Sequence, residues 1–350
     1  MKAALVAESG ELVIDEVAIP EISEDEVLVE VKYCGICGSD LYFYRKQRPV
    51  KRSIYPGHEF SGVIAEVGKS VRGWKPGERV AIIPVYICGE CSACRRGRHR
   101  ECEHKFENCI GIGHGRANAG AYAKFVKVSI PEWRLHRLPD GVSFEEGALV
   151  EPLACSLNGV KISGLRVGEH TMVLGAGPIG LGVIAFLKYA GAGLIIVQEI
   201  VEKRAELAKK LGADYVFNPQ KTLNLKEKVF ELTNGKGVDV VFDCSGVAQV
   251  FLGATGYLRY GGRVTLLGIV EGGVSVTPGI WVMREWSILA SGAYGLDEFP
   301  VAIDFLKKGI SPIKEMVTSK IKLSNLVKEG FEVLCQPGHN EIKILVEPDE

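Results

Sequence analysis

The sequence predicts an α/β protein in which a doubly wound parallel sheet is inserted into a β-rich domain. Three observations lead to this prediction: alternating apolar segments before residue 84, a glycine-rich turn after an apolar strand near residue 175, and strands that alternate with helices beyond it. Alternation of strands and helices is typical of a parallel sheet covered by helices. The expected boundaries are residues 1–152 and 293–350 for the β-rich domain and residues 153–292 for the inserted one.

Length and composition limit the possible functions. A chain of 350 residues with 47% hydrophobic residues can build two domains with full cores. Its net charge of -1 argues against a nucleic-acid partner or a polybasic membrane surface. The short apolar start reaches Glu8 at once, unlike a signal peptide. Ten cysteines in such a chain indicate metal ligands and buried thiols, and we expect a cytoplasmic protein.

The N-terminal segment reads as strands separated by turns. Val27, Val29 and Val31 alternate with more polar positions, which predicts a strand with one buried face. The expected strands are 2–7, 12–19, 26–33, 61–67, 79–84 and 121–128, with a short helix at 41–48.

The stretch Cys37-Gly38-Ser39-Asp40 and the stretch Gly57-His58-Glu59 supply a possible metal centre. A thiolate, an imidazole and a carboxylate are ligands that suit zinc, and three protein ligands with one open position are typical of catalytic zinc. Ser39 lies close enough to reach an oxygen in the open position, and Asp40 could hold the second nitrogen of His58. The alternative is a buried structural cysteine with an unrelated histidine.

A second cluster, within a lobe at about residues 86–104, predicts a structural zinc site. Four closely spaced thiolates make a closed tetrahedral site, and they are Cys88, Cys91, Cys94 and Cys102. The glycines and basic residues between them predict a loop without helix or strand, which the metal would stabilise. An iron–sulfur cluster is the alternative. Together the two clusters predict two zinc ions per chain.

Glu151 is a lone carboxylate in an apolar stretch. Charged residues in such surroundings are usually paired or bound to metal, so Glu151 is a candidate ligand of the first centre, directly or through water. Alternatively, it is an acidic residue in the first turn of a helix, next to Pro152.

The motif after the apolar strand 170–174 predicts dinucleotide binding. It opens a helix at about 181–190, and a second strand follows at 194–197, which is the context that the motif requires. The expected cofactor contacts in the motif are Gly175, Gly177, Pro178, Ile179 and Gly180. Glu199 can accept both ribose hydroxyls and would repel a 2′-phosphate, which favours NAD over NADP. Arg204 is a further candidate for cofactor contact. The positive charges of Lys203 and Arg204 leave NADP open as the cofactor. Alternatively, both side chains are simply solvated on the surface of a helix.

The rest of the chain continues the alternation and then returns to the first domain. The expected strands are 215–217, 238–243, 263–267, 287–290, 316–321 and 342–346, and the expected helices are 223–232, 247–258, 296–308 and 326–334.

Taken together, these motifs resemble the zinc-containing medium-chain alcohol dehydrogenases, and within them the polyol branch of sorbitol (L-iditol), 2,3-butanediol and threonine 3-dehydrogenases. The resemblance implies a GroES-like β-rich domain, a Rossmann domain, and zinc at Cys37, His58 and Glu59, with Glu151 as a direct or water-mediated ligand. It also implies Ser39 as the first member of a proton relay, and a homo-oligomer, commonly a tetramer.

These features predict reversible NAD-linked oxidation of a secondary alcohol on a polyol or sugar-like substrate. The stretch around Tyr294 looks closer to threonine dehydrogenases, whereas the stretch before Cys88 lacks the histidine that they tend to have. An uncommon polyol, an inositol derivative or a sugar acid is therefore open as the substrate. L-Threonine 3-dehydrogenase and 2,3-butanediol dehydrogenase are the alternative enzymes, and a non-catalytic NAD-binding protein is the alternative of another class.

Overall fold

Strands from the N-terminal part of the chain and two strands near its C-terminal end form one sheet. The computed structural model describes residues 1–46, 53–112 and 120–349, and within them this sheet has seven strands. In spatial order they are β14 (Val317–Lys322), β15 (Lys343–Glu347), β3 (Glu26–Gly35), β4 (Glu59–Val67), β5 (Arg79–Ile82) and β7 (Leu135–Arg137), with β6 (Phe125–Ser129) paired to β3. Val27, Val29 and Val31 are buried, as their alternation predicts. A separate antiparallel pair joins β1 (Lys2–Val6) and β2 (Leu12–Glu16).

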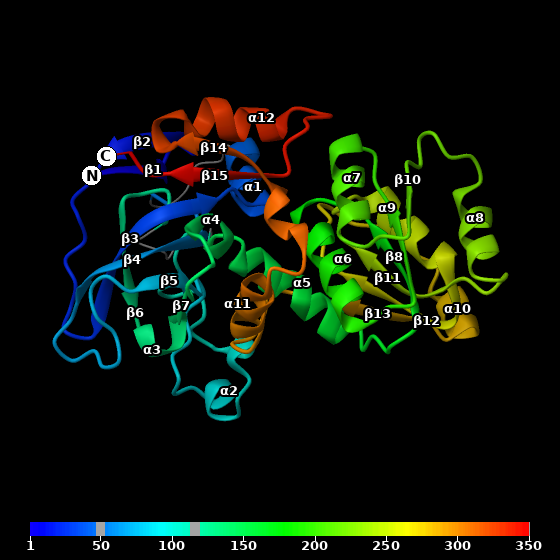
Figure 1. The fold of residues 1–350 in the computed structure, drawn as a ribbon, viewed down its shortest axis with the longest axis horizontal. Coiled ribbons are helices and arrows are strands. Elements are labelled where there is room, and N and C mark those ends of the chain that lie inside the picture. The colour runs from blue at the N-terminus through cyan, green and yellow to red at the C-terminus, as the bar shows by residue number, and fades with distance from the viewer. Residues whose placement is uncertain (47–52, 113–119, 350) are drawn as a thin grey trace. The chain divides into compact units, whose positions relative to one another are not determined.

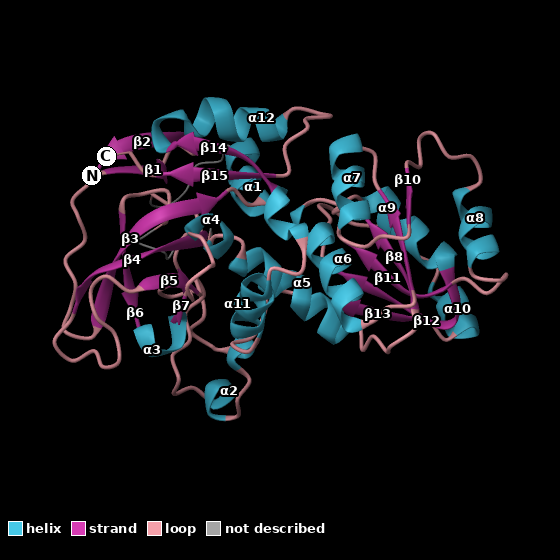
Figure 2. Ribbon diagram, viewed as in Figure 1, coloured by secondary structure: helices cyan, strands magenta, loops and turns pink. Residues whose placement is uncertain are grey.

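Short helices lie among the loops that connect these strands (Figure 2). They are α1 (Gly38–Lys46), α2 (Ser92–Arg95), α3 (Pro131–Arg134), α4 (Phe144–Gly147), α11 (Glu298–Lys308) and α12 (Glu332–Cys335), with η1 (His99–Glu101), η4 (Leu323–Asn325) and η5 (Leu326–Phe331). The prediction of a cysteine lobe without helix is wrong, because α2 and η1 lie inside it. The helix expected at 326–334 is present, but its first part is π-helical. Residues 47 and 48 of the helix expected at 41–48 lie outside the described residues.

The middle of the chain forms a parallel sheet with the order of a Rossmann fold. Its six described strands follow the order β10 (Tyr215–Phe217), β9 (Leu194–Gln198), β8 (His170–Leu174), β11 (Val238–Asp243), β12 (Leu258–Leu266) and β13 (Ser287–Ala290). The order reverses between β8 and β11, and ligands of such sheets bind at this point, beyond the carboxyl ends of the strands. The loop after β8 carries the glycine motif.

Helices alternate with these strands along the chain (Figure 1). They are α5 (Val150–Ile162), α6 (Pro178–Ala190), α7 (Glu202–Lys210), α8 (Leu225–Leu232), α9 (Ala248–Ala254) and α10 (Pro278–Arg284), with η2 (Thr255–Tyr257) and η3 (Pro312–Met316). The core between sheet and helices consists of buried aliphatic residues such as Met172, Ile196 and Val241.

The described chain divides into two units. The first contains Met1–Glu151, Gly295–Lys308 and Val317–Glu350, and the second contains Pro152–Tyr294 and Gly309–Met316. The sequence assigned residues 309–316 to the first unit. They belong to the second because η3 packs against α6 and α7 and buries Ile313 and Met316. One short crossing of this kind leaves no signal in hydrophobic periodicity.

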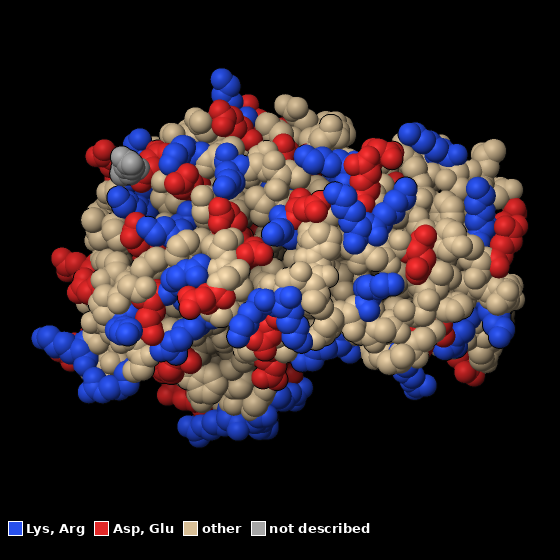
Figure 3. Space-filling model, in the orientation of Figure 1, with Lys and Arg blue, Asp and Glu red and all other residues tan. Residues whose placement is uncertain are grey.

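The distribution of charged side chains on the surface agrees with the net charge of -1. Figure 3 shows lysine and arginine side chains interspersed with aspartate and glutamate side chains over the visible face. Among the described residues, the helices are all too short or too polar to cross a membrane.

Candidate active site

Adjacent strands of the first unit bring the predicted ligands together. Cys37 follows the end of β3, and Glu59 begins β4, directly opposite Gly35 in the antiparallel register. The candidate ligand atoms of Cys37, His58 and Glu59 all lie within 4.8 Å of one another. His58 and Glu59 are buried and Cys37 is half-buried. Residues twenty positions apart thus form one cluster that combines a thiol, an imidazole and a carboxylate, a donor set suited to zinc.

Asp40 connects the two segments that carry this cluster. Its Oδ2 accepts hydrogen bonds from the Cys37 amide at 3.1 Å and the Tyr122 hydroxyl at 2.8 Å, and its Oδ1 accepts one from the Gly57 amide at 3.4 Å. The Nδ1 of His58 lies 3.6 Å from Oδ1, which is longer than a hydrogen bond, so the two groups interact electrostatically.

Electrostatics indicate that the cluster has excess negative charge. Burial opposes protonation of His58, yet Asp40 and Cys37 raise its pKa well above the usual value. The Nδ1 of His58 is buried and has no hydrogen-bond partner in the described structure. A divalent cation among these donors would balance the charge, so the residues fit a metal ion.

Lys343 is a member of this site that the sequence did not reveal. It is 2% exposed, and its Nζ donates hydrogen bonds to Glu59 Oε2 at 2.5 Å and to the Ile36 carbonyl at 2.8 Å. Burial lowers its pKa, but Glu59 and Cys37 outweigh burial and raise it. Its sequence signal was a single charge inside the apolar last strand, the same kind of signal that identified Glu151.

Glu151 lies in the first turn of α5 and is buried. A position in the first turn of a helix and a role as metal ligand are therefore compatible for this residue. Its negative charge reaches both His58 and Lys343. Among the described residues it is not part of the group whose donor atoms lie within 4.8 Å of one another. Ser39 is half-buried in the first turn of α1, two residues after Cys37.

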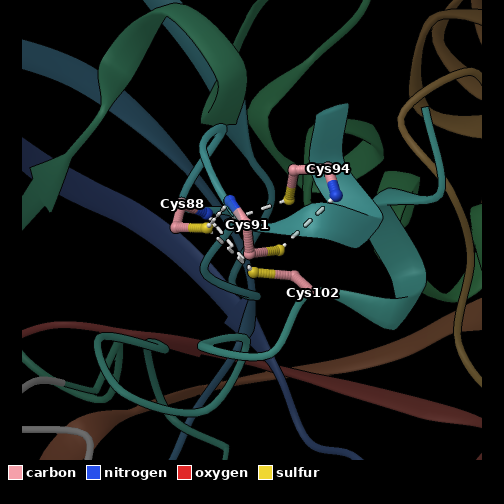
Figure 4. Close-up of side chains that lie close together, drawn as sticks. All are labelled: Cys88, Cys91, Cys94 and Cys102. Carbon is pink, nitrogen blue, oxygen red and sulfur yellow. Dashed lines mark hydrogen bonds between the residues drawn. The ribbon is translucent and has the colours of Figure 1, made fainter. Parts of the chain in front are cut away.

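The four lobe cysteines converge as predicted, and Figure 4 shows their sulfur atoms directed toward one another. The Sγ of Cys88 lies 3.6 Å from that of Cys102 and 3.9 Å from that of Cys94, and all four are free thiols. Tetrahedral zinc with sulfur ligands at about 2.3 Å implies sulfur–sulfur distances of about 3.8 Å. The geometry therefore fits a closed zinc site.

Backbone amides and a sparse core complete the lobe. Hydrogen bonds from the amides of Cys94 and Glu103 lower the pKa of Cys91 to about 6, whereas burial raises the pKa of Cys94 to about 12. A bound metal ion would therefore have to stabilise the Cys94 thiolate. The buried core of the lobe consists largely of the cysteines themselves, with Ile87 and Ala93. So small a core is consistent with stabilisation by metal.

The glycine motif of the second unit forms a turn onto a helix N-terminus. Gly175 has a positive φ of 89°, and a Cβ on Gly180 would come within 1.9 Å of the Gly175 carbonyl. Gly177 precedes α6, which Pro178 and Ile179 open. The start of this helix offers unpaired amides and a positive dipole end to a pyrophosphate.

Glu199 holds this loop in addition to its expected role toward the ribose. Its Oε2 accepts a hydrogen bond from the Ala176 amide at 2.7 Å, and its Oε1 accepts from the amides of Ile200 and Val201 at 2.7 and 2.8 Å. Arg204 lies near it: burial lowers the pKa of Arg204 and the charge of Glu199 opposes this effect. The alternative that Arg204 is a fully solvated side chain is therefore wrong.

Comparisons with known proteins agree with both units. Residues 23–140 match the family model of the alcohol dehydrogenase GroES-like domain, and residues 178–308 match the model described as zinc-binding dehydrogenase. The chain is 35% identical to (R,R)-butanediol dehydrogenase and 32% identical to sorbitol dehydrogenase of Bacillus subtilis (strain 168), over its whole length and at least 98% of theirs. It is also 32% identical to L-threonine 3-dehydrogenase of Rhizobium etli, over 95% of each chain.

Solved structures show the same fold with bound cofactor. A zinc-binding dehydrogenase from Sinorhizobium meliloti 1021 bound to NADP has a TM-score of 0.88 at 31% identity, over 99% of each chain. An Escherichia coli CFT073 alcohol dehydrogenase complexed with NADH has a TM-score of 0.87 at 29% identity, also over 99% of each chain. The chain belongs to the zinc-binding medium-chain alcohol dehydrogenases and is a zinc-dependent dehydrogenase.

Proposed function

We propose that the chain catalyses the reversible NAD-linked oxidation of a secondary alcohol of a polyol, sugar alcohol or cyclitol to a ketone. The observation that carries this proposal is the buried convergence of Cys37, His58 and Glu59 in a zinc-dependent dehydrogenase. When bound, zinc would supply polarisation of the substrate hydroxyl and NAD⁺ would supply the hydride acceptor, so that the alcohol and NAD⁺ would give a ketone, NADH and one proton.

Each residue of the site has a defined part in this proposal. Cys37, His58 and Glu59 hold the catalytic metal, while Lys343 fixes one oxygen of Glu59 and Asp40 fixes the backbone next to Cys37 and His58. Glu151 adds a negative charge beside them, as a direct or water-mediated ligand. Ser39, on the first turn of α1, accepts the hydroxyl proton and passes it outward. The four lobe cysteines hold a second, structural zinc.

The cofactor proposed is NAD. Glu199 and Arg204 are the side chains that would meet the adenosine ribose, and the carboxylate of Glu199 opposes a 2′-phosphate. The amides of Gly175 and Ala176 already donate within the protein. The amides of Gly177, Ile179 and Gly180, at the start of α6, would therefore receive the pyrophosphate.

The relatives support the proposed substrate class, and a panel of alcohols tests it. With NAD, we expect oxidation of polyols such as sorbitol, 2,3-butanediol or an inositol. L-Threonine is the second candidate, favoured by the stretch 292–295 and by the threonine dehydrogenase relative. NADH formation from threonine alone would overturn the polyol assignment.

The role of the metal centre is tested with two cysteine variants. Cys37→Ala is expected to lose turnover and one zinc ion while NAD binding persists. Cys335→Ala is the matched control, because Cys335 is a half-buried free thiol of the same unit outside both clusters. Full activity in Cys37→Ala would end the proposal.

We also propose a homo-oligomer, as the resemblance implies. β13 is the last strand in its sheet, and Val282 and Met283 on the preceding helix α10 are 78% and 70% exposed, so this edge offers an apolar surface to a second copy. Sedimentation of the wild type and of Met283→Lys tests it; a monomeric wild type would contradict it.

A further inference from the structure

Tyr122 is a fully buried phenol that no step of the proposed reaction uses. Its side chain is 1% exposed, and its ring packs edge-on against Phe331 with centroids 6.1 Å apart. Its hydroxyl lies 2.8 Å from Asp40 Oδ2 and 3.2 Å from the Gly35 carbonyl. A hydroxyl has one proton to donate, and the carboxylate is the stronger of these two acceptors.

The carboxylate that receives this proton is the connection between the two halves of the metal centre. Asp40 accepts the amide of Cys37 through Oδ2 and that of Gly57 through Oδ1, and it faces the Nδ1 of His58. Buried carboxylates need such donors to stay in place. A rotation of this side chain would therefore change the positions of Cys37 and His58 together.

The backbone at Ala121 and Tyr122 supports the turn that precedes His58. The amide of Ala121 donates to the Gly57 carbonyl at 2.8 Å. Gly57 has a φ of +94°, and a Cβ there would lie 2.7 Å from the Tyr122 amide nitrogen and 2.9 Å from the Tyr122 ring. The ring thus contributes packing and the hydroxyl contributes the bond to Asp40, and a phenylalanine would keep the first and lose the second.

We propose that the Tyr122 hydroxyl is a positioning group of the metal centre, which acts by holding Asp40 in the orientation that aligns Cys37 and His58. This inference rests on the proposed metal centre. Loss of a partner that orients a metal ligand typically lowers metal affinity about 10–100-fold. Because Tyr122 acts on the ligands only through Asp40, we expect Tyr122→Phe to weaken metal retention at this centre by roughly tenfold, the lower end of this range, with little effect on the separate four-cysteine lobe.

The experiment uses the structural zinc as an internal reference. Zinc-loaded wild type, Tyr122→Phe and Tyr44→Phe are challenged with excess chelator, and metal release from each centre is followed with a colorimetric indicator. Cys37→Ala, which is expected to lack the zinc of the Cys37 centre, identifies the phase of metal release that comes from the lobe. Tyr44→Phe is the matched control, since Tyr44 also packs against Phe331 but makes no contact with Asp40 among the bonds described. The visible spectrum of the cobalt-substituted proteins reports ligand geometry independently of activity.

The expected result is faster release from the Cys37 centre alone in Tyr122→Phe, together with a changed cobalt spectrum. Equal release from both centres, or release and spectrum identical to those of the wild type, would overturn the inference. If Tyr122→Phe does not fold, Asp40→Asn, which leaves the ring in place, is expected to show the same selective loss, and unselective loss would overturn the inference. A wild type that holds only the lobe zinc would instead contradict the proposed function.

Discussion

Replacement of Lys343 by methionine tests how the site is held before it binds metal. Lys343 and Glu59 are each 2% exposed, and a hydrogen bond of 2.5 Å joins them. Methionine keeps most of the length and volume of the side chain and removes only the charge and its donors. The variant therefore leaves a buried carboxylate without its cation and the Ile36 carbonyl without its donor.

The size of the effect follows from this burial. Removal of one partner of a buried ion pair costs about 3–5 kcal/mol, because the remaining charge is uncompensated. Since neither group is exposed, solvent does not screen the loss. Zinc at Cys37, His58 and Glu59 would supply a replacement cation, so the zinc-loaded variant is expected to lose only about 1–2 kcal/mol, the contribution of the hydrogen bond to Ile36.

The assay is urea unfolding of zinc-free and zinc-loaded protein, wild type and variant. Lys322→Met is the matched control, because Lys322 pairs with Glu347 on the neighbouring strand but both side chains are about half exposed; such surface pairs contribute about 0–1 kcal/mol. We expect a large loss for zinc-free Lys343→Met and a partial recovery on zinc addition. A loss no larger than that of Lys322→Met, or one that zinc does not change, would refute the reasoning.

Three further predictions follow from other contacts. Burial lowers the pKa of His136 to about 4, so only the unfolded chain binds a proton between about pH 4 and its usual pKa of 6.5. Stability should therefore fall by up to about 3 kcal/mol as pH drops through this range, and urea curves of His136→Phe should lack that part of the fall. Glu199→Gln removes a charge that opposes the 2′-phosphate and also one acceptor of the loop amides. Because the loop would serve both cofactors, the kcat/KM ratio of NAD to NADP should fall, and an unchanged ratio would exclude that role of the charge. Cys102→Ser should lose one zinc and make the lobe sensitive to limited proteolysis, and a full zinc content would contradict the structural site.

Local patterns in the sequence were sufficient to predict most of the fold. The turn at Gly175 sits between an apolar strand and a helix, and the alternating valines of β3 identify its buried face, because both signals lie within a few residues. The fold class and the family are confirmed. The metal-binding and cofactor roles of individual residues stay predictions, although the structure brings the donor groups of both clusters together.

Contacts between distant segments could not be predicted in the same way. Lys343 pairs with Glu59 across 284 positions, and Tyr122 pairs with Asp40 across 82. No spacing rule connects such positions; only the sheet register and the packing of the return segment do. The helical turns of the cysteine lobe were missed for another reason: the Cys91 thiol accepts the Cys94 amide and so caps α2, a role that propensities do not assign to cysteine.

The most direct test of the account is a crystal of the zinc-loaded protein measured on both sides of the zinc absorption edge. We predict two anomalous peaks per chain, one among the lobe cysteines and one within bonding distance of Cys37, His58 and Glu59. A single peak in the lobe, from protein that still oxidises alcohols with NAD, would contradict the claim that these residues hold the catalytic metal.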